Sequence, residues 1–301
     1  MVRPKISVVI PVYNRTDELR KTLDSLIYQT IPAEQFEVVI ADDGSAEDVK
    51  AVLTEYPQLQ IKYAHQPDEG YRVAAARNLG AAQAEGEIIV FSDNGIVFST
   101  TALERHVANH DANGETFVVL GNMYATASGI DQDLALEILE NNDIDTAIEK
   151  LKAENITDGR EPMFVRDGQD VSAWFIPWQA FWGGHFSVNS AFVKKHGIHF
   201  NETFTFWGCE DIEYGIQLYD AGATLCFCRD VAVAHYPEPS SVALKELTSE
   251  EWKEKHTKPR QHIVSLYPGR REIEAWVELG GRINTAEKRA EYYKNKGWDV
   301  V

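Results

Sequence analysis

Carboxylate side chains follow two apolar segments of this sequence, at positions where a buried strand would end. Asp93 lies in VFSDNGIVF (90–98), and Asp42 and Asp43 close FEVVIADDGS (36–45). Acids at such positions can hold a metal ion or accept a hydrogen bond from a ligand. The alternative is that both tetrapeptides, SDNG and DDGS, only form the turns that their residue types favour.

A second acidic pair, Glu210 and Asp211, follows a glycine and a run of aromatic residues in FWGCEDIEYG (206–215). One of these carboxylates could act as the general base that deprotonates an attacking hydroxyl group. The alternative is an ordinary helix start, where acids in the first turn interact favourably with the helix dipole. His235 ends the apolar segment VAVAH and is either a metal ligand or a structural histidine.

Two arginines, Arg72 and Arg77, lie in the alanine-rich segment EGYRVAAARNLGAAQAEG (69–86). So many small residues predict a helix that is closely packed on both sides. An arginine in such a helix is expected to have an anionic partner, and a diphosphate would serve. The alternative is a solvated helix face.

Composition limits the possible partners. The 301 residues carry a formal net charge of −18, which disfavours nucleic acid and anionic membranes because like charges repel. The three cysteines form no even-numbered disulfide framework, which fits a reducing compartment. No run approaches the roughly 20 apolar residues of a membrane helix. We therefore expect a cytoplasmic protein without a membrane span.

Apolar strands alternate with helical patterns in the first part of the chain. Strands are expected at 6–14, 36–45, 59–67 and 87–93, and helices at 15–30, after 45 and at 69–86. Thr16 is expected to cap the first helix, and Ser45 with Asp48 to form a capping box at the second. This alternation predicts a parallel sheet covered by helices on both faces, with Asn14, Asp42, Asp43 and Asp93 at the carboxyl ends of its strands.

The later part of the chain is less regular. Further strands are expected at 116–126 and 224–239, and residues 135–155 have helical periodicity within an acidic, irregular stretch. Residues from about 243 onward are charged and mostly helical. We predict one α/β domain over 1–239, with a nucleotide-binding half (1–115) and an acceptor or catalytic half (116–239), followed by a helical C-terminal extension (240–301).

Six motifs, taken in order, resemble one family. They are PVYNR, ADDGS, DEGYRVAAARNLG, FSDNG, FWGCEDIEYG and HYPEP. Together they resemble the inverting family 2 glycosyltransferases of the GT-A fold, and the transferase domains of bacterial chondroitin and hyaluronan polymerases in particular. The similarity covers about residues 5–239, whereas 125–172 and the C-terminal extension match no family motif.

This resemblance implies a Rossmann-like GT-A sheet, a nucleotide-sugar donor that is most often UDP-linked, and transfer with inversion at the anomeric carbon. A divalent cation, Mn²⁺ or Mg²⁺, would neutralise the leaving diphosphate. The acceptor would be a glycan, a small molecule or a peptide. Because the polymerases join two transferase domains and this chain has room for one, addition of single sugars is expected.

The resemblance also assigns roles to individual residues. Nucleotide binding would fall to Pro11, Tyr13, Asn14, Asp42, Arg72, Arg77 and Asp93. Asp93 would be the first acid of the family's Asp-x-Asp metal motif and His235 a distant metal ligand. Asp211 would be the catalytic base, with Glu210 beside it. The acceptor or sugar pocket would include Trp207, Gly184 and His185.

One position departs from the family pattern, because Gly95 stands where the second acid of the metal motif is expected. Asp93 and His235 could hold the ion together with the diphosphate and water, Asn94 could lend an amide oxygen, or the metal site could be weak. In the last case the chain would be a nucleotide-sugar or glycan-binding module without turnover. A sugar-1-phosphate nucleotidyltransferase is a third reading, but it would need a glycine-rich basic loop where this chain has IPVYNRTDE.

Overall fold

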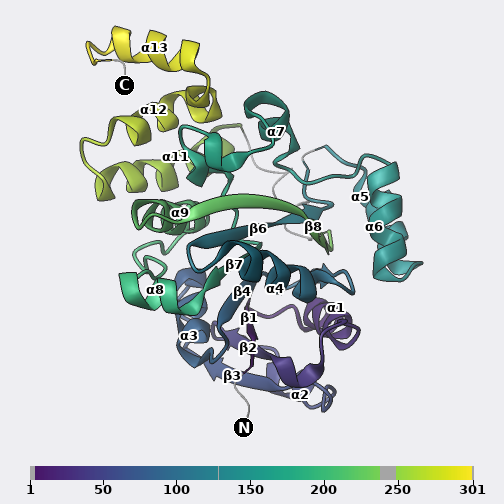
Figure 1. Ribbon diagram of the computed structural model, residues 1–301. Helices are drawn as coiled ribbons and strands as arrows, with labels where there is room; N and C mark the ends of the chain where they lie inside the picture. The colour runs from purple at the N-terminus through teal and green to yellow at the C-terminus, as the bar shows by residue number, and fades with distance from the viewer. Residues whose placement is uncertain (1–3, 128, 238–248, 300–301) are drawn as a thin grey trace.

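An eight-stranded mixed sheet forms the centre of the molecule (Figure 1). The computed structural model describes residues 4–127, 129–237 and 249–299. The strand order is β3-β2-β1-β4-β7-β6-β8-β5. The strands are β1 (Ile6–Val12), β2 (Phe36–Asp42), β3 (Ile61–His65), β4 (Ile88–Ser92), β5 (Ile96–Phe98), β6 (Phe117–Tyr124), β7 (His185–Asn189) and β8 (Thr224–His235).

The first four strands in this order are parallel, as the sequence predicted. Every residue of β1, β2 and β4 is buried, because helices cover both faces of this part of the sheet. Alternate residues of β1 face opposite sides of the sheet. Val9 lies on the face that α3 (Val73–Gln83) covers, whereas Val8 and Ile10 lie on the face that α1 (Thr16–Ile27) covers.

The second half of the sheet is mixed. β7 runs antiparallel to both β4 and β6, β5 runs antiparallel to β8, and β6 runs parallel to β8. The expected strand at 224–239 ends at His235, and residues 238–239 lie outside the described part. β5 directly follows the turn at 93–95 and is a strand that was not predicted from the sequence.

Helices surround the sheet. Besides α1 and α3, they are α2 (Val49–Leu53), α4 (Ala102–Asn113), α5 (Gln132–Glu140), α6 (Ile144–Ala153), α7 (Glu161–Asp167), α8 (Ser190–His196), α9 (Glu210–Asp220), α11 (Ser249–Leu266), α12 (Arg271–Leu279) and α13 (Ala286–Asn295). Short 3₁₀ turns occur at Ala33–Gln35, Val171–Ala173, Pro177–Ala180 and Gly280–Asn284. None of the described helices is both long enough and apolar enough to cross a membrane.

Three local predictions about helix boundaries need correction. Arg15, not Thr16, occupies the N-cap position of α1, and Thr16 is bound by Glu47. The expected capping box at the second helix does not form, because Asp48 alone caps α2 by accepting from the backbone N–H of Ala51. The helical periodicity of 135–155 corresponds to two helices, since Asp143 starts α6 with a new cap.

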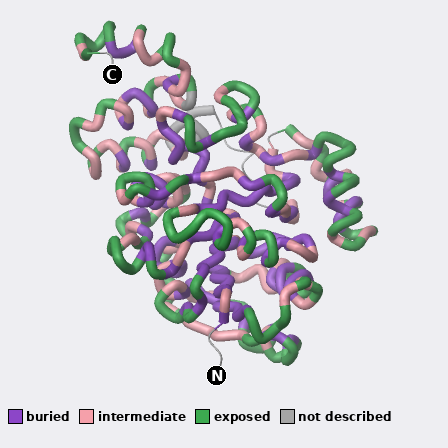
Figure 2. Tube along the Cα trace, viewed as in Figure 1, coloured by how far each residue is buried: buried purple, intermediate pink, exposed green. Residues whose placement is uncertain are grey.

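The C-terminal helices share the main hydrophobic core of the protein. Ile263, Ile273 and Trp276 belong to the same buried cluster as Phe186 of β7, and the Trp276 ring meets the edge of Trp178 at 5.2 Å. Figure 2 shows buried residues running through the sheet and along the inner sides of these helices. The helical extension is therefore packed onto the domain that carries the strands.

Candidate active site

Arg77 lies at the centre of the candidate site and links residues that are far apart in the sequence. Its guanidinium group is only 3% exposed, and it pairs with Asp93 at 2.8 Å and with Glu210 at 2.9 Å. α3 supplies the arginine, the turn after β4 supplies Asp93, and the first turn of α9 supplies Glu210. A buried arginine between two carboxylates neutralises charge that would otherwise be costly to bury.

Asp211 lies next to this bridge and is partly open to solvent. Its Oδ2 accepts a hydrogen bond from the backbone N–H of Gly183 at 2.8 Å, and its Oδ1 accepts one from Ile212 at 2.7 Å. Burial and the neighbouring charge of Glu210 nevertheless raise the pKa of Asp211 to about 7, against the opposing effects of these hydrogen bonds and of Arg77. A carboxylate with such a pKa is well suited to general base catalysis near neutral pH.

The turn before α9 explains how the two acids are presented. Gly208 and Cys209 both have positive φ angles, +102° and +69°, so the chain reverses sharply just before Glu210. For Cys209 this left-handed conformation is unfavourable. Pro259 of α11 packs against Gly208, where an added Cβ would meet the proline ring at 3.7 Å. The C-terminal extension thus contacts the turn that carries the acids.

Trp207 precedes this turn and is 45% exposed. Its ring already has neighbours from α11: the Lys255 ammonium group lies 4.8 Å from the ring centre, and the His256 ring lies 5.5 Å away. The expectation that Trp207 stacks on a sugar stays a prediction. Any such stacking has to use the ring area that these two side chains leave open.

The acids after β2 have partners within the protein. Asp42 accepts from the hydroxyl of Tyr63 at 2.6 Å and from the backbone of Ser45 at 2.8 Å. Asp43 accepts from Gln66 and from the backbone N–H of Arg72, and burial raises its pKa. Both carboxylates therefore hold the loop after β2, and their binding to a nucleotide base stays a prediction.

The end of β1 is arranged differently. Tyr13 is 50% exposed, with its hydroxyl donating to Asp68 at 3.0 Å, so one face of its ring can be reached by a ligand. The side chain of Asn14 accepts hydrogen bonds from Ala46 and Glu47 and thereby joins the loops after β1 and β2. Pro11 is buried within β1.

Arg72 contacts acids of the protein. Its side chain pairs with Glu69 and lies 3.9 Å from Glu202. The neighbouring Tyr71 was not among the predicted site residues. It is 39% exposed, and burial of its hydroxyl together with the charge of Glu210 raises its pKa. The only sequence signal for Tyr71 was its place in the motif DEGYRVAAARNLG, between Gly70 and Arg72.

The proposed metal ligands lie on adjacent segments of the sheet. His235 pairs in register with Ile96, three residues after Asp93. One oxygen of Asp93 is bound by Arg77, and the other makes no hydrogen bond or ion pair within the described part of the chain. Among the described residues, no group of three His, Cys, Asp or Glu side chains could hold a metal ion. These two side chains fit a metal only if the substrate supplies the remaining ligands.

Gly95 and Asn94 complete the turn. Gly95 has a φ of +93°, and an added Cβ would point toward Arg15 and Glu18 on the α1 side. Asn94 donates its amide to the carbonyl oxygen of Arg15, and its buried Oδ1 has no hydrogen-bond partner among the residues that the structure describes. The turn is therefore tied to the start of α1.

His185 requires a correction, because the structure does not place it in a sugar pocket. It is fully buried on β7, where its Nε2 lies 3.0 Å from Nε2 of His106. Burial lowers its pKa to about 3, so it is neutral. Gly184, the residue before it, contacts Asp93, since its carbonyl oxygen accepts from the backbone N–H of Asp93 at 2.9 Å, and its place in a sugar pocket stays a prediction.

Comparison with solved structures assigns the fold. The chain superposes on the mannosyltransferase PcManGT from Pyrobaculum calidifontis in complex with GDP-Man and Mn²⁺ with a TM-score of 0.61, at 17% identity, covering all of this chain and 77% of the other. It superposes on S. aureus TarS 1–349 in complex with UDP-GlcNAc with a TM-score of 0.60, at 19% identity, covering 96% and 73%. The fold is that of the GT-A glycosyltransferases, as predicted.

Sequence comparison gives the family. The family model described as glycosyl transferase family 2 matches residues 7–172, more than half of the chain, and the chain belongs to this family. It is 36% identical over 229 residues to validoxylamine A glucosyltransferase of Streptomyces hygroscopicus subsp. jinggangensis, covering 75% of this chain and 54% of that protein. It is 31% identical over 250 residues to chondroitin synthase of Escherichia coli, covering 78% and 35%. The chain thus spans about half the length of the first relative and about a third of the second.

Proposed function

We propose that this chain transfers one sugar from a nucleotide-diphosphate sugar, a UDP-sugar in the first instance, to a nucleophile on a separate acceptor, with inversion at the anomeric carbon. The observation that carries the proposal is Asp211. Its carboxylate has a pKa of about 7 and lies beside the Arg77 bridge, and the residue as a whole is partly exposed. The acceptor class stays open among glycans, small molecules and peptides.

In this proposal Asp211 removes the proton of the acceptor hydroxyl while the acceptor oxygen bonds to the anomeric carbon. The bond from that carbon to the diphosphate breaks at the same time, and the diphosphate leaves with the electron pair. The hydrogen bonds from Gly183 and Ile212 fix the orientation of the Asp211 carboxylate, while Glu210 keeps its pKa high. A base whose pKa lies near the working pH is efficient in such a step.

The donor would bind along the edge formed by β1, β2 and β4. Tyr13 offers an exposed ring for stacking on the base, Asn14 and Asp42 hold the loops after β1 and β2, and Pro11 lies in the strand that leads to Tyr13. Arg72 and Arg77 would lie near the diphosphate. We propose that Asp93 and His235 hold a divalent cation, with the remaining ligands from the diphosphate and water. The cation would supply Lewis-acid neutralisation of the leaving group.

The test is turnover of a panel of UDP-, GDP- and dTDP-sugars with Mn²⁺ and a range of acceptors. Asp211→Asn should reduce kcat by about 10²-fold or more, the usual contribution of a general base. Asp220→Asn is the matched control, because Asp220 lies at the opposite end of α9 and pairs with Arg270 at the surface. Equal activity of Asp211→Asn and the parent would exclude Asp211 as the base.

A second candidate is a binding module that retains the fold without turnover. It is favoured by one observation, the lack of a three-ligand metal cluster among the described residues. Calorimetry separates the two: Asp93→Ala and His235→Ala should weaken Mn²⁺-dependent binding of the nucleotide if they hold the cation. Donor binding by the parent with no turnover across the panel would favour the second candidate.

A further inference from the structure

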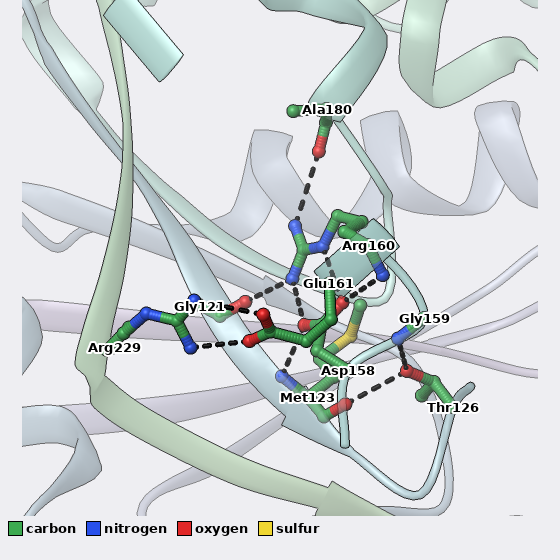
Figure 3. A network of polar contacts seen from close by, with 9 residues as sticks. All are labelled: Gly121, Met123, Thr126, Asp158, Gly159, Arg160, Glu161, Ala180 and Arg229. Atoms are coloured by element: carbon green, nitrogen blue, oxygen red, sulfur yellow. Dashed lines mark hydrogen bonds and ion pairs between the residues drawn. The ribbon is translucent and has the colours of Figure 1, made fainter. Parts of the chain in front are cut away.

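A fully buried ion pair lies within residues 125–172, a segment in which the sequence showed no recognised motif but which the family model covers. The side chains of Asp158 and Arg160 are both 0% exposed. The carboxylate accepts from Nε of Arg160 at 2.9 Å, from Nη2 at 2.6 Å and from the backbone N–H of Arg160 at 2.8 Å (Figure 3). A buried ion pair is by itself weak evidence for stability, because desolvation offsets its attraction. Its contacts indicate what it does.

The ion pair connects strand β6 with the 3₁₀ turn Pro177–Ala180. The Asp158 carboxylate also accepts from the backbone N–H of Met123 on β6 at 2.9 Å. The Arg160 guanidinium donates to the carbonyl oxygen of Gly121, also on β6, and to that of Ala180 at 3.3 Å. Figure 3 shows the guanidinium group between these carbonyl groups and the carboxylate. Its centre also lies 5.6 Å from the ring of Trp182.

The segment 180–184, which Arg160 contacts, supports both halves of the candidate site. Gly183 donates its backbone N–H to Asp211, and Gly184 accepts from the backbone N–H of Asp93. Neither glycine has a side chain that could anchor it. Their backbone is held on one side by β7, which begins at His185, and on the other by the contacts of Ala180 and Trp182 with Arg160.

We infer that Asp158 and Arg160 are positioning residues for Asp211: they hold segment 180–184 on β6 so that the Gly183 N–H points at the Asp211 carboxylate. This rests on the proposed role of Asp211 as the base. The charged and titratable groups near Asp211 are Glu210 on its own helix, Cys209 at the start of that helix, Arg77 on α3 and Tyr71 before α3. The ion pair acts separately from these groups, through the backbone of Gly183.

Two variants test the inference. Arg160→Lys keeps a positive charge beside Asp158 but cannot reach all the carbonyl groups that the guanidinium spans. Trp182→Leu keeps both members of the buried ion pair and removes the ring that lies against Arg160 and Gly159. It therefore remains informative if Arg160→Lys fails to fold. Glu161→Gln is the matched control, because Glu161 lies in the same segment but pairs with Arg229 at the surface.

Loss of the Gly183 hydrogen bond removes a contact that favours the charged carboxylate, so the pKa of Asp211 should rise further, by about 0.5 to 1 pH unit. The acid limb of the kcat profile should move to higher pH by the same amount. At pH 7, kcat should fall by about 10-fold or more, with the KM for the donor changed less than about 2-fold. A lower melting temperature alone would produce neither the pH shift nor the split between kcat and KM.

The pKa of Asp211 can also be followed without turnover, by ¹³C NMR titration of its carboxyl carbon, assigned with Asp211→Asn. An unchanged Asp211 pKa in folded Arg160→Lys and Trp182→Leu would overturn the inference. An equal shift in Glu161→Gln would overturn it as well. Full activity of Asp211→Asn would instead refute the proposed function, and the titration would still decide whether the ion pair positions Asp211.

Discussion

The ionised form of Asp211, which the proposed reaction needs, costs folding free energy. Its pKa of about 7 in the folded protein lies above the value of about 3.9 for an unfolded aspartate. The cost is therefore present in full above about pH 7, and it disappears as the pH falls toward 4, where both states are protonated.

Asparagine carries no charge at this position, so Asp211→Asn should gain stability relative to the parent as the pH rises. We expect the difference in Tm, variant minus parent, to increase between about pH 4 and 7 and then to level off. The amide has one oxygen and can accept only one of the two backbone hydrogen bonds, from Gly183 or from Ile212, so losing the other lowers the Tm of the variant at every pH. Calorimetric scans of both proteins at four pH values check this, and a difference independent of pH would contradict the raised pKa.

Gly183 lies against Arg77 and Asp211, where there is little room for a side chain. An added Cβ would lie 3.0 Å from Nη2 of Arg77 and 3.1 Å from Cβ of Asp211, so it would press between the bridge and the base. Gly183→Ala should reduce kcat by about 10²-fold, since small misplacements of reacting groups are costly. The neighbouring Gly184→Ala would mainly meet the flexible thioether of Met123. Steady-state kinetics should therefore show the larger loss for Gly183→Ala, and the reverse order would show that this close approach is unimportant.

At the scale of elements, the C-terminal helices stabilise the turn that presents the acids. α11 packs Pro259 against Gly208, and Tyr267 at its end donates to Glu213 of α9 at 2.7 Å. Trp276 of α12 is 4% exposed and meets Trp178, which is itself buried in the main core. Helices that share a core with the sheet should unfold together with it.

Trp276→Ala should therefore destabilise the whole domain, by about 3–5 kcal/mol for a buried tryptophan. Urea unfolding followed by far-UV circular dichroism measures the loss, and a single transition is expected. Tyr28→Ala is the control, because Tyr28 is 69% exposed. A separate early transition with the main one unchanged would show instead that the C-terminal helices unfold independently.

At the scale of the whole molecule, the parallel half of the fold could be predicted because three of its four strands, β1, β2 and β4, are mostly apolar runs buried on both faces. The mixed half could not, since the antiparallel pairing of β7 with β4 brings together residues 93 to 101 positions apart, from Ser92 with His185 to Ile88 with Asn189. The bridge from Arg77 to Glu210 spans 133 positions, and no spacing in one sequence indicates it. The prediction that His185 lies in a sugar pocket was wrong. In the strand HFSVN, His185 and Ser187 point to one face of the sheet, and Phe186 and Val188 point to the other. That pattern places His185 on the side of the buried serine and histidines.

These buried histidines connect β7 to α4. His106 bonds to both Ser187 and His185, and His110 bonds to Ser187 at 2.8 Å. Burial lowers the pKa of all three, that of His110 to about 4 and that of His106 well below its ordinary value. All three histidines are therefore neutral in the folded protein at neutral pH.

A histidine with a lowered pKa makes the folded state lose stability as the pH falls, because the unfolded chain takes up a proton below about pH 6.5 and the folded chain does not. His110 should contribute about 1.4 kcal/mol per pH unit between about pH 6 and 4.5. Asp111 and Lys5, the charged groups near it, act on its pKa in opposite directions.

His110→Leu removes this titration at the cost of one hydrogen bond to Ser187. Urea unfolding at several pH values should show a slope smaller by that amount, whereas His65→Leu, at an exposed position, serves as the control for loss of an imidazole. Parallel stability curves for His110→Leu and the parent would mean that this histidine takes up its proton equally in both states.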